Sequence, residues 1–123
     1  MKRDMDLIRA ILLAIDGTPG AELRELPNFD GYSHEQVAYH ARLLKQAGFV
    51  SAIDATTFDG EDYLELSLSW DGHEFLETVR DGELWKKTKE SAGKVGNWGV
   101  KLLAELAIGA ARAKAARLGI PLA

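Results

Sequence analysis

The chain has 123 residues, 46% of them hydrophobic and 28% charged, which is typical of one soluble globular domain and short for two. Cysteine is absent, which excludes disulfide bonds and thiolate metal sites. The formal net charge of −4 is unevenly distributed: residues 1–82 hold 7 basic and 16 acidic side chains, whereas residues 83–123 hold 8 and 3.

Two apolar stretches could be mistaken for membrane-directed segments. The N-terminal stretch is interrupted by Asp4, Asp6 and Arg9 and is followed by no small-residue cleavage site. The C-terminal stretch from residue 98 is interrupted by Lys101, Glu105, Arg112, Lys114 and Arg117. We therefore expect a cytoplasmic protein with no membrane partner.

The first 32 residues predict one helix and one segment that is hard to interpret. Apolar residues recur with helical spacing between residues 4 and 16, and the sequence GTPG then ends the helix. The following AELRELPNF alternates around Leu23 and Leu26, which suits a brief strand or a single irregular turn.

The next segment predicts a helix followed by a β-hairpin. Ser33 is placed to cap a helix whose core stripe contains Val37, Ala41 and Leu44, and Gly48 is placed to end it. FVSAID and YLELSLS then alternate as two strands, and the pair Asp59-Gly60 between them is typical of a hairpin turn.

Three further helices are predicted after the hairpin, over residues 70–81, 82–94 and 98–118. In the first of them we expect Trp70, Phe75, Leu76 and Val79 to point inward.

This order of elements is that of a winged helix-turn-helix, in which LLKQAGFV marks the step from the recognition helix into the first wing strand. We therefore predict an α+β, mainly helical fold: a winged helix with a two-stranded hairpin wing and extra C-terminal helices. Residues 1–82 would form the winged-helix domain and residues 83–123 a helical extension of it. The helix that normally precedes the recognition helix has no clear sequence: either AELRELP supplies a short turn or the helix is missing.

Three segments together resemble the small proteins of domain-of-unknown-function family 2513, found in bacteria and in their phages and prophages. They are MKRDMDLIRAILLAID, GYSHEQVAYHARLLKQAGFV and LSWDGHEFLETVRDGELWKKTKE. The resemblance covers roughly residues 1–100. It implies a winged-helix-like fold and a mobile-element origin, and it implies no reaction.

The predicted recognition helix presents a polar face opposite its core stripe. Gln36 and Gln46 could pair with adenine, Arg42 with guanine or phosphate, and Tyr39 could stack. With the cap Ser33 and the lysine cluster of the following helix, the candidate DNA-binding residues are Ser33, Gln36, Tyr39, Arg42, Gln46, Lys86, Lys87 and Lys89. The same faces could instead be solvated, and the lysines could offset the acidic body of the protein.

The predicted wing is unfavourable for DNA, because five carboxylates between residues 54 and 65 have no compensating Lys or Arg. If the domain binds DNA, the wing must point away and the basic tail must supply phosphate contacts.

The last predicted helix has a broad apolar side with small residues that allow close approach of another helix. We expect it to form a homodimer interface through Leu103, Leu106, Ala107, Ala110 and Ala111. Folding back onto its own core is the alternative, and a lipid-surface helix is the least favoured.

Catalysis has little support in the sequence. His40 borders the core stripe and is expected to be a satisfied, partly buried histidine. His73 and Glu77 have a spacing that permits a shared metal ligand but is common on solvated helices. We expect no enzyme activity, no cofactor and no metal.

The leading hypothesis is a non-catalytic, DNA-binding transcription regulator that acts on double-stranded DNA as a homodimer. The alternative is a protein-interaction module that uses the acidic wing and binds no DNA.

Overall fold

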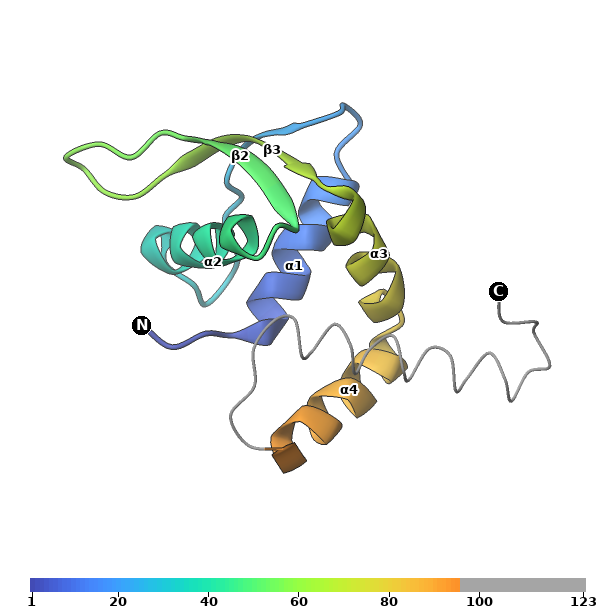
Figure 1. Ribbon diagram of the computed structural model, residues 1–123. Coiled ribbons are helices and arrows are strands. Elements are labelled where there is room, and N and C mark those ends of the chain that lie inside the picture. Colours follow the sequence, from blue (N-terminus) through green and yellow to red (C-terminus); the bar gives the residue numbers. More distant parts are fainter. Residues whose placement is uncertain (96–123) are drawn as a thin grey trace. The chain divides into compact units, whose positions relative to one another are not determined.

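The computed structural model (Figure 1) describes residues 1–95 of the chain. Its elements in order are α1 (Met5–Asp16), β1 (Leu23–Glu25), α2 (His34–Gln46), β2 (Val50–Asp54), β3 (Tyr63–Leu68), α3 (Trp70–Val79) and α4 (Gly82–Val95). The described residues form an α+β fold and about half of them are helical, as the sequence predicts. The chain divides after His73 into two compact units, which are described separately.

Helix α1 supplies the largest share of the core in the first unit. Asp4 caps it, because its carboxylate accepts hydrogen bonds from the backbone N–H groups of Asp6 and Leu7, at 2.9 and 3.2 Å. The predicted stripe is buried as expected, and consists of Leu7, Ile8, Ile11, Leu12 and Ile15. This stripe packs α1 against both α2 and β3.

The sheet has three antiparallel strands in the order β1-β3-β2. The predicted hairpin is present as β2 and β3, and β1 adds a third strand by pairing Leu23 with Leu66 and Glu25 with Leu64. Of the two interpretations of AELRELPNF, a brief strand or a single irregular turn, the brief strand is therefore confirmed. Residues 26–33, all described, contain no helix, so α2 follows β1 without the helix that usually precedes a recognition helix.

A bulge in β3 changes which of its side chains face the core. Between the pairs Ser51–Ser67 and Ile53–Leu64, β3 has one residue more than β2. Glu65 lies in this bulge with φ 54°, in the left-handed region. The extra residue lets Tyr63 and Leu66 both be buried, although a regular strand would have placed Tyr63 and Glu65 on one face.

Helix α2 begins and ends as the sequence predicts. The Ser33 hydroxyl accepts from the Gln36 N–H at 3.1 Å, while the Gln36 side chain accepts from the Ser33 N–H at 2.7 Å, which completes a capping box. Val37, Ala41 and Leu44 are buried.

Gly48 ends the α2 segment with φ 82°. The chain then passes directly into β2, and the hairpin extends over α2 (Figure 1).

His40 links α2 to the start of α1. Its side chain is only 1% exposed, and its Nε2 accepts a hydrogen bond from the Asp4 N–H at 2.7 Å. Since Nε2 accepts, the ring proton lies on Nδ1, which donates to the Gln36 carbonyl at 2.6 Å. His40 is therefore a satisfied core residue, as predicted, and is more deeply buried than expected.

Tyr32, in the loop before α2, also binds Asp4 at the start of α1. Its hydroxyl donates to the Asp4 carboxylate at 2.6 Å. This hydrogen bond, with the nearby carboxylate charge and partial burial, raises the pKa of Tyr32 to about 12.

The junction between β3 and α3 depends on a close backbone approach. Ser69 Oγ accepts from the Gly72 N–H at 3.0 Å, and the Ser69 N–H donates to the Phe49 carbonyl at 3.0 Å. A Cβ on Gly72 would lie 2.0 Å from that carbonyl oxygen, so only glycine fits here.

Helices α3 and α4 follow the predicted ranges closely. Phe75, Leu76 and Val79 are buried, but Trp70 is 78% exposed, so its predicted inward position is wrong. The physical reason is helical geometry: steps of about 100° place Trp70 roughly 180° from Val79. The helix predicted over residues 98–118 lies outside the described residues.

Candidate partner-binding surface

The hairpin is braced against the outer side of α2 by one carboxylate. Glu61 Oε2 accepts from the Tyr63 hydroxyl at 2.7 Å and pairs with Arg42 Nε at 2.9 Å. Tyr63 is only 4% exposed, and its burial, followed by the bond to Glu61, raises its pKa to about 12. We call the set Arg42, Glu61 and Tyr63 the brace.

Cation–aromatic contacts extend the brace along α2. The Arg42 guanidinium lies 5.1 Å from the centre of the Tyr39 ring, and Lys45 Nζ lies 5.7 Å from the centre of the Tyr63 ring. Both basic side chains of α2 are therefore engaged within the unit.

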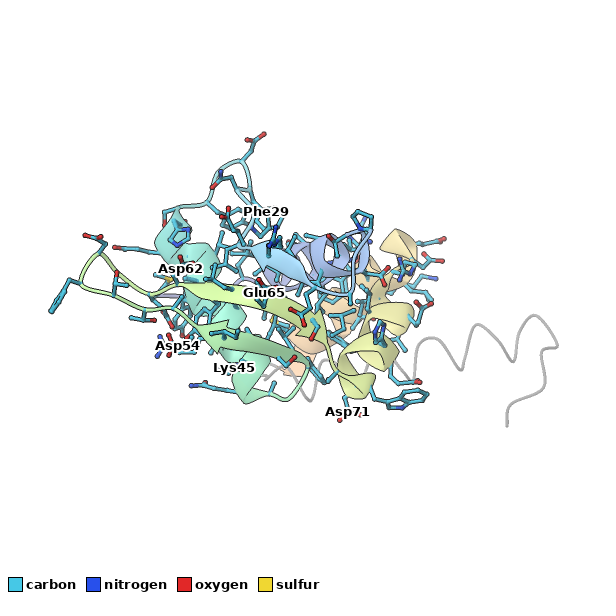
Figure 2. The ribbon with its side chains drawn as sticks, turned by 90° about the horizontal axis from the view of Figure 1, so that it is seen from above. Phe29, Lys45, Asp54, Asp62, Glu65 and Asp71 are labelled. Atoms are coloured by element: carbon cyan, nitrogen blue, oxygen red, sulfur yellow. The ribbon has the colours of Figure 1, made fainter. Side chains whose placement is uncertain are left out.

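The first turn of α2 also contacts the hairpin. His34 Nε2 lies 3.3 Å from Asp62 Oδ1, and this contact is an ion pair only when the histidine is protonated. In Figure 2 the hairpin is seen from above over α2, with Lys45, Asp54 and Asp62 labelled. The hairpin therefore contacts α2 at both ends of the helix, through His34 in the first turn and Lys45 in the last.

A shallow pocket of about 380 Å³ lies beside the brace. It is lined by Met1, Glu35, Tyr39, Arg42, Gly60 and Glu61. Its one guanidinium is already paired with a carboxylate, and a second carboxylate, that of Glu35, lies in its wall. This composition does not favour a phosphate or another anion.

The hairpin ends in a tight, hydrogen-bonded turn. Thr57 and Gly60 exchange backbone hydrogen bonds, each 3.1 Å, around Phe58 and Asp59. The turn is present where the sequence predicts it, but it encloses residues 58–59 instead of 59–60, with Gly60 following at φ 135°. The Phe58 side chain is fully exposed, at 111% of its reference area.

The first unit carries a strong negative charge. Residues 1–73 hold 6 basic and 13 acidic side chains, and no Lys or Arg occurs between Lys45 and Arg80. Hydrogen bonds from the Thr56 side chain and backbone hold the pKa of Asp54 below its usual value. The hairpin carboxylates therefore favour a cationic partner.

The structure places the predicted DNA-binding residues in three situations. Ser33 and Gln36 use their side chains to cap α2, and Arg42 and Tyr39 belong to the braced side of the helix. Gln46 is exposed.

The predicted lysine cluster lies on α4, in the second unit. Lys86 and Lys87 are exposed, whereas Lys89 Nζ lies 5.7 Å from the centre of the Trp85 ring. The predicted dimerisation residues lie outside the described residues: Leu103, Leu106, Ala107, Ala110 and Ala111.

Sequence reasoning missed the pairing of Glu61 with both Arg42 and Tyr63, and it missed Phe58. The pairing could not be read from spacing, because it joins segments about twenty residues apart whose register depends on the bulge. Phe58 did leave a signal. An aromatic residue in TTFDGED stands where turn chemistry favours Gly, Asn, Asp or Ser.

Neither a metal site nor a membrane span is found in residues 1–95. No group of three His, Asp or Glu side chains in this part is placed to hold a metal ion. None of the helices described is long and apolar enough to cross a bilayer.

The fold and the brace define a small α+β protein with a helix-supported acidic hairpin. The chain belongs to the family described as "Hypothetical protein (DUF2513)", which matches residues 2–97. It is also similar to an uncharacterized protein of Haemophilus influenzae, with 39% identity over 90 residues that cover 72% of this chain and 76% of the relative. No solved structure matches the chain. The family resemblance predicted from the sequence is thus confirmed.

Proposed function

We propose that this protein is a non-catalytic, winged-helix-like interaction module whose acidic hairpin binds a basic protein surface. The brace is the observation that carries the proposal. Glu61 neutralises Arg42, the one arginine on the side of α2 that would otherwise face DNA, while Asp54 and Asp59 on the same hairpin are left exposed.

Electrostatics support a protein partner over DNA for the hairpin. DNA presents one phosphate charge per about 1.7 Å of axis, and a binding protein gains affinity by neutralising several of them. A hairpin with no Lys or Arg gains nothing from phosphates. Its carboxylates would instead steer a cationic surface toward it.

The architecture supports the winged-helix comparison in part. Helix α2 passes through Gly48 directly into a two-stranded hairpin, as a recognition helix passes into a wing. The segment from β1 to α2 differs, because residues 26–33 contain no helix. A scaffold of this kind with an altered reading helix suits a protein that binds other proteins.

The test compares a charge reversal on the hairpin with the same change elsewhere. Asp59→Lys reverses an exposed carboxylate at the turn, whose side chain accepts no hydrogen bond from the described residues. Asp30→Lys is the matched control in the exposed loop before α2. The probe is a fluorescein-labelled lysine-rich peptide at low salt, followed by anisotropy.

We expect Asp59→Lys to weaken peptide binding severalfold and Asp30→Lys to have a smaller effect. Raising the salt concentration should weaken binding by the wild type. Equal effects of the two reversals, or no binding by the wild type, would contradict the proposal.

The second candidate function is DNA binding by a homodimer, as the sequence first suggested. It is favoured by the exposed Gln46 on α2 and by the exposed Lys86 and Lys87 on α4. Anisotropy with a labelled random duplex at low salt tests it: binding by the wild type should be lost when both lysines are changed to glutamate. A duplex that does not bind at tens of micromolar protein removes this candidate.

A further inference from the structure

The most exposed large side chain on the hairpin is also its most apolar one. Phe58 lies at the corner of the turn with its whole ring in solvent. The loop that carries it projects beyond the end of α2 in both views (Figures 1 and 2). An exposed phenyl ring contributes nothing to the folded core, and the turn itself would accept a polar residue at this position.

The turn that carries Phe58 is built by hydrogen bonds. Besides the two bonds between Thr57 and Gly60, Thr57 Oγ1 accepts from the Asp59 N–H at 3.2 Å, and the Ala55 N–H donates to the Asp62 carbonyl at 2.9 Å. A ring on an ordered loop loses little conformational entropy on binding, which favours affinity.

The brace holds the base of the same loop. Glu61 is adjacent to Gly60, and its carboxylate is bound by both the Tyr63 hydroxyl and Arg42. Helix α2 therefore fixes the direction in which the tip extends. The tip presents one aromatic ring with the carboxylate of Asp59 beside it.

We propose that Phe58 is the anchor of the interaction, and that the partner is a protein surface with an apolar patch bordered by Lys or Arg side chains. The inference rests on the proposed function, and it adds an apolar contact to what was an argument from charge alone. Aromatic anchors surrounded by polar contacts carry most of the energy in many interfaces.

Charge decides against nucleic acid and anionic lipid at the tip, because the hairpin carboxylates would repel both. The first unit of a second copy, with 13 acidic and 6 basic side chains, would be repelled too. Residues 83–123 of that copy hold 8 basic and 3 acidic side chains, and sedimentation tests for that contact. A basic amphipathic surface would offer apolar contact to the Phe58 ring and cationic side chains to the hairpin carboxylates.

The experiment uses the full-length chain and two labelled peptides. One contains only lysine and glycine, and the other contains lysine and leucine arranged as an amphipathic helix with an apolar face bordered by ammonium groups. Wild type, Phe58→Ala, Asp59→Lys and Trp70→Ala are compared by anisotropy. Trp70→Ala is the matched control, because it removes another exposed aromatic ring that lies at the start of α3 and not in the hairpin turn.

We expect the wild type to bind the leucine-containing peptide at least about tenfold more tightly than the glycine-containing one. Phe58→Ala should abolish this difference, while Trp70→Ala should leave it unchanged. Because the Phe58 ring is fully exposed, Phe58→Ala should melt with the wild type, which excludes unfolding as the cause.

The other outcomes separate the two proposals. If Phe58→Ala binds both peptides as the wild type does while Asp59→Lys weakens both, the anchor is wrong and the proposed function stands. If the wild type binds neither peptide, the proposed function fails and the anchor fails with it. A wild-type dimer in sedimentation that Phe58→Ala dissociates would make the partner a second copy and overturn the assignment to a basic protein.

Discussion

The change Gly72→Ala tests the junction between the hairpin and α3. The added Cβ would lie 2.0 Å from the Phe49 carbonyl oxygen and 3.0 Å from its carbonyl carbon. To reach the ordinary contact distance of 3.4 Å, the two segments must move apart by about 1.4 Å. The obstacle is backbone, so no side-chain rotation relieves it.

The expected cost follows from three contributions. Moving Phe49 breaks or weakens the bond from the Ser69 N–H, a loss of about 1 kcal/mol. Forcing one carbon into a packed site costs about 1–3 kcal/mol, and the better helix propensity of alanine returns about 1 kcal/mol. We expect a net loss of about 2 kcal/mol, or a Tm lower by about 8–16 °C.

Thermal unfolding followed by circular dichroism measures this loss, with Gly82→Ala as the matched control. Gly82 begins α4, and a Cβ there meets nothing within 4 Å, so its stability should stay the same or rise by up to about 1 kcal/mol. If both variants melt at or above the wild-type temperature, the close approach of Gly72 to Phe49 is wrong.

Three other changes probe the core, the bulge and the buried tyrosine. His40→Phe removes the acceptor of the Asp4 N–H, and urea unfolding should show a loss of about 2 kcal/mol; an unchanged midpoint would contradict the network. Glu65→Gly should stabilise the protein by up to about 1 kcal/mol, because glycine relieves the positive φ; destabilisation would argue against the bulge. The raised pKa of Tyr63 means that its contribution to stability is full below pH 10.0 and is lost as pH rises through about 12; Tyr63→Phe should make the loss of stability across this range smaller, with the loss due to Tyr32 remaining, and an unaltered profile would contradict it.

Local signals were enough to predict most of the elements in the described part. Ser33 and Gly48 predict the two ends of α2, because helix capping and a left-handed φ depend on the type of a single residue. Periodicity identified the buried side of α1 for the same reason, since all its contacts repeat with the turn of one helix.

The errors come from interactions between distant segments or from the ends of elements. The apolar character of Trp70 predicts an inward position, but the first residue of a helix need not share the face of the later ones. The sequence does not decide between a strand and a turn at Leu23–Glu25, because three residues carry too little pattern. Only pairing with Leu66 and Leu64 makes them a strand.

In the candidate surface, too, local features could be predicted from the sequence and contacts between distant segments could not. Arg42 and Tyr39 were named correctly as residues on the outer side of α2, since helical geometry alone places them there. Their neutralisation by Glu61 depends on where the hairpin folds, which in turn depends on one bulged residue. Charge counting could indicate an acidic wing but could not locate its carboxylates.

The use of Asp4 has a practical consequence for handling the protein. This residue accepts from Asp6, Leu7 and Tyr32 and donates its N–H to His40, so deleting the first four residues would release two helices at once. Met1, three positions earlier, already lines the pocket beside Arg42. An affinity tag fused ahead of Met1 would therefore emerge next to Tyr39, Arg42 and Glu61 and would compete with a partner for this surface.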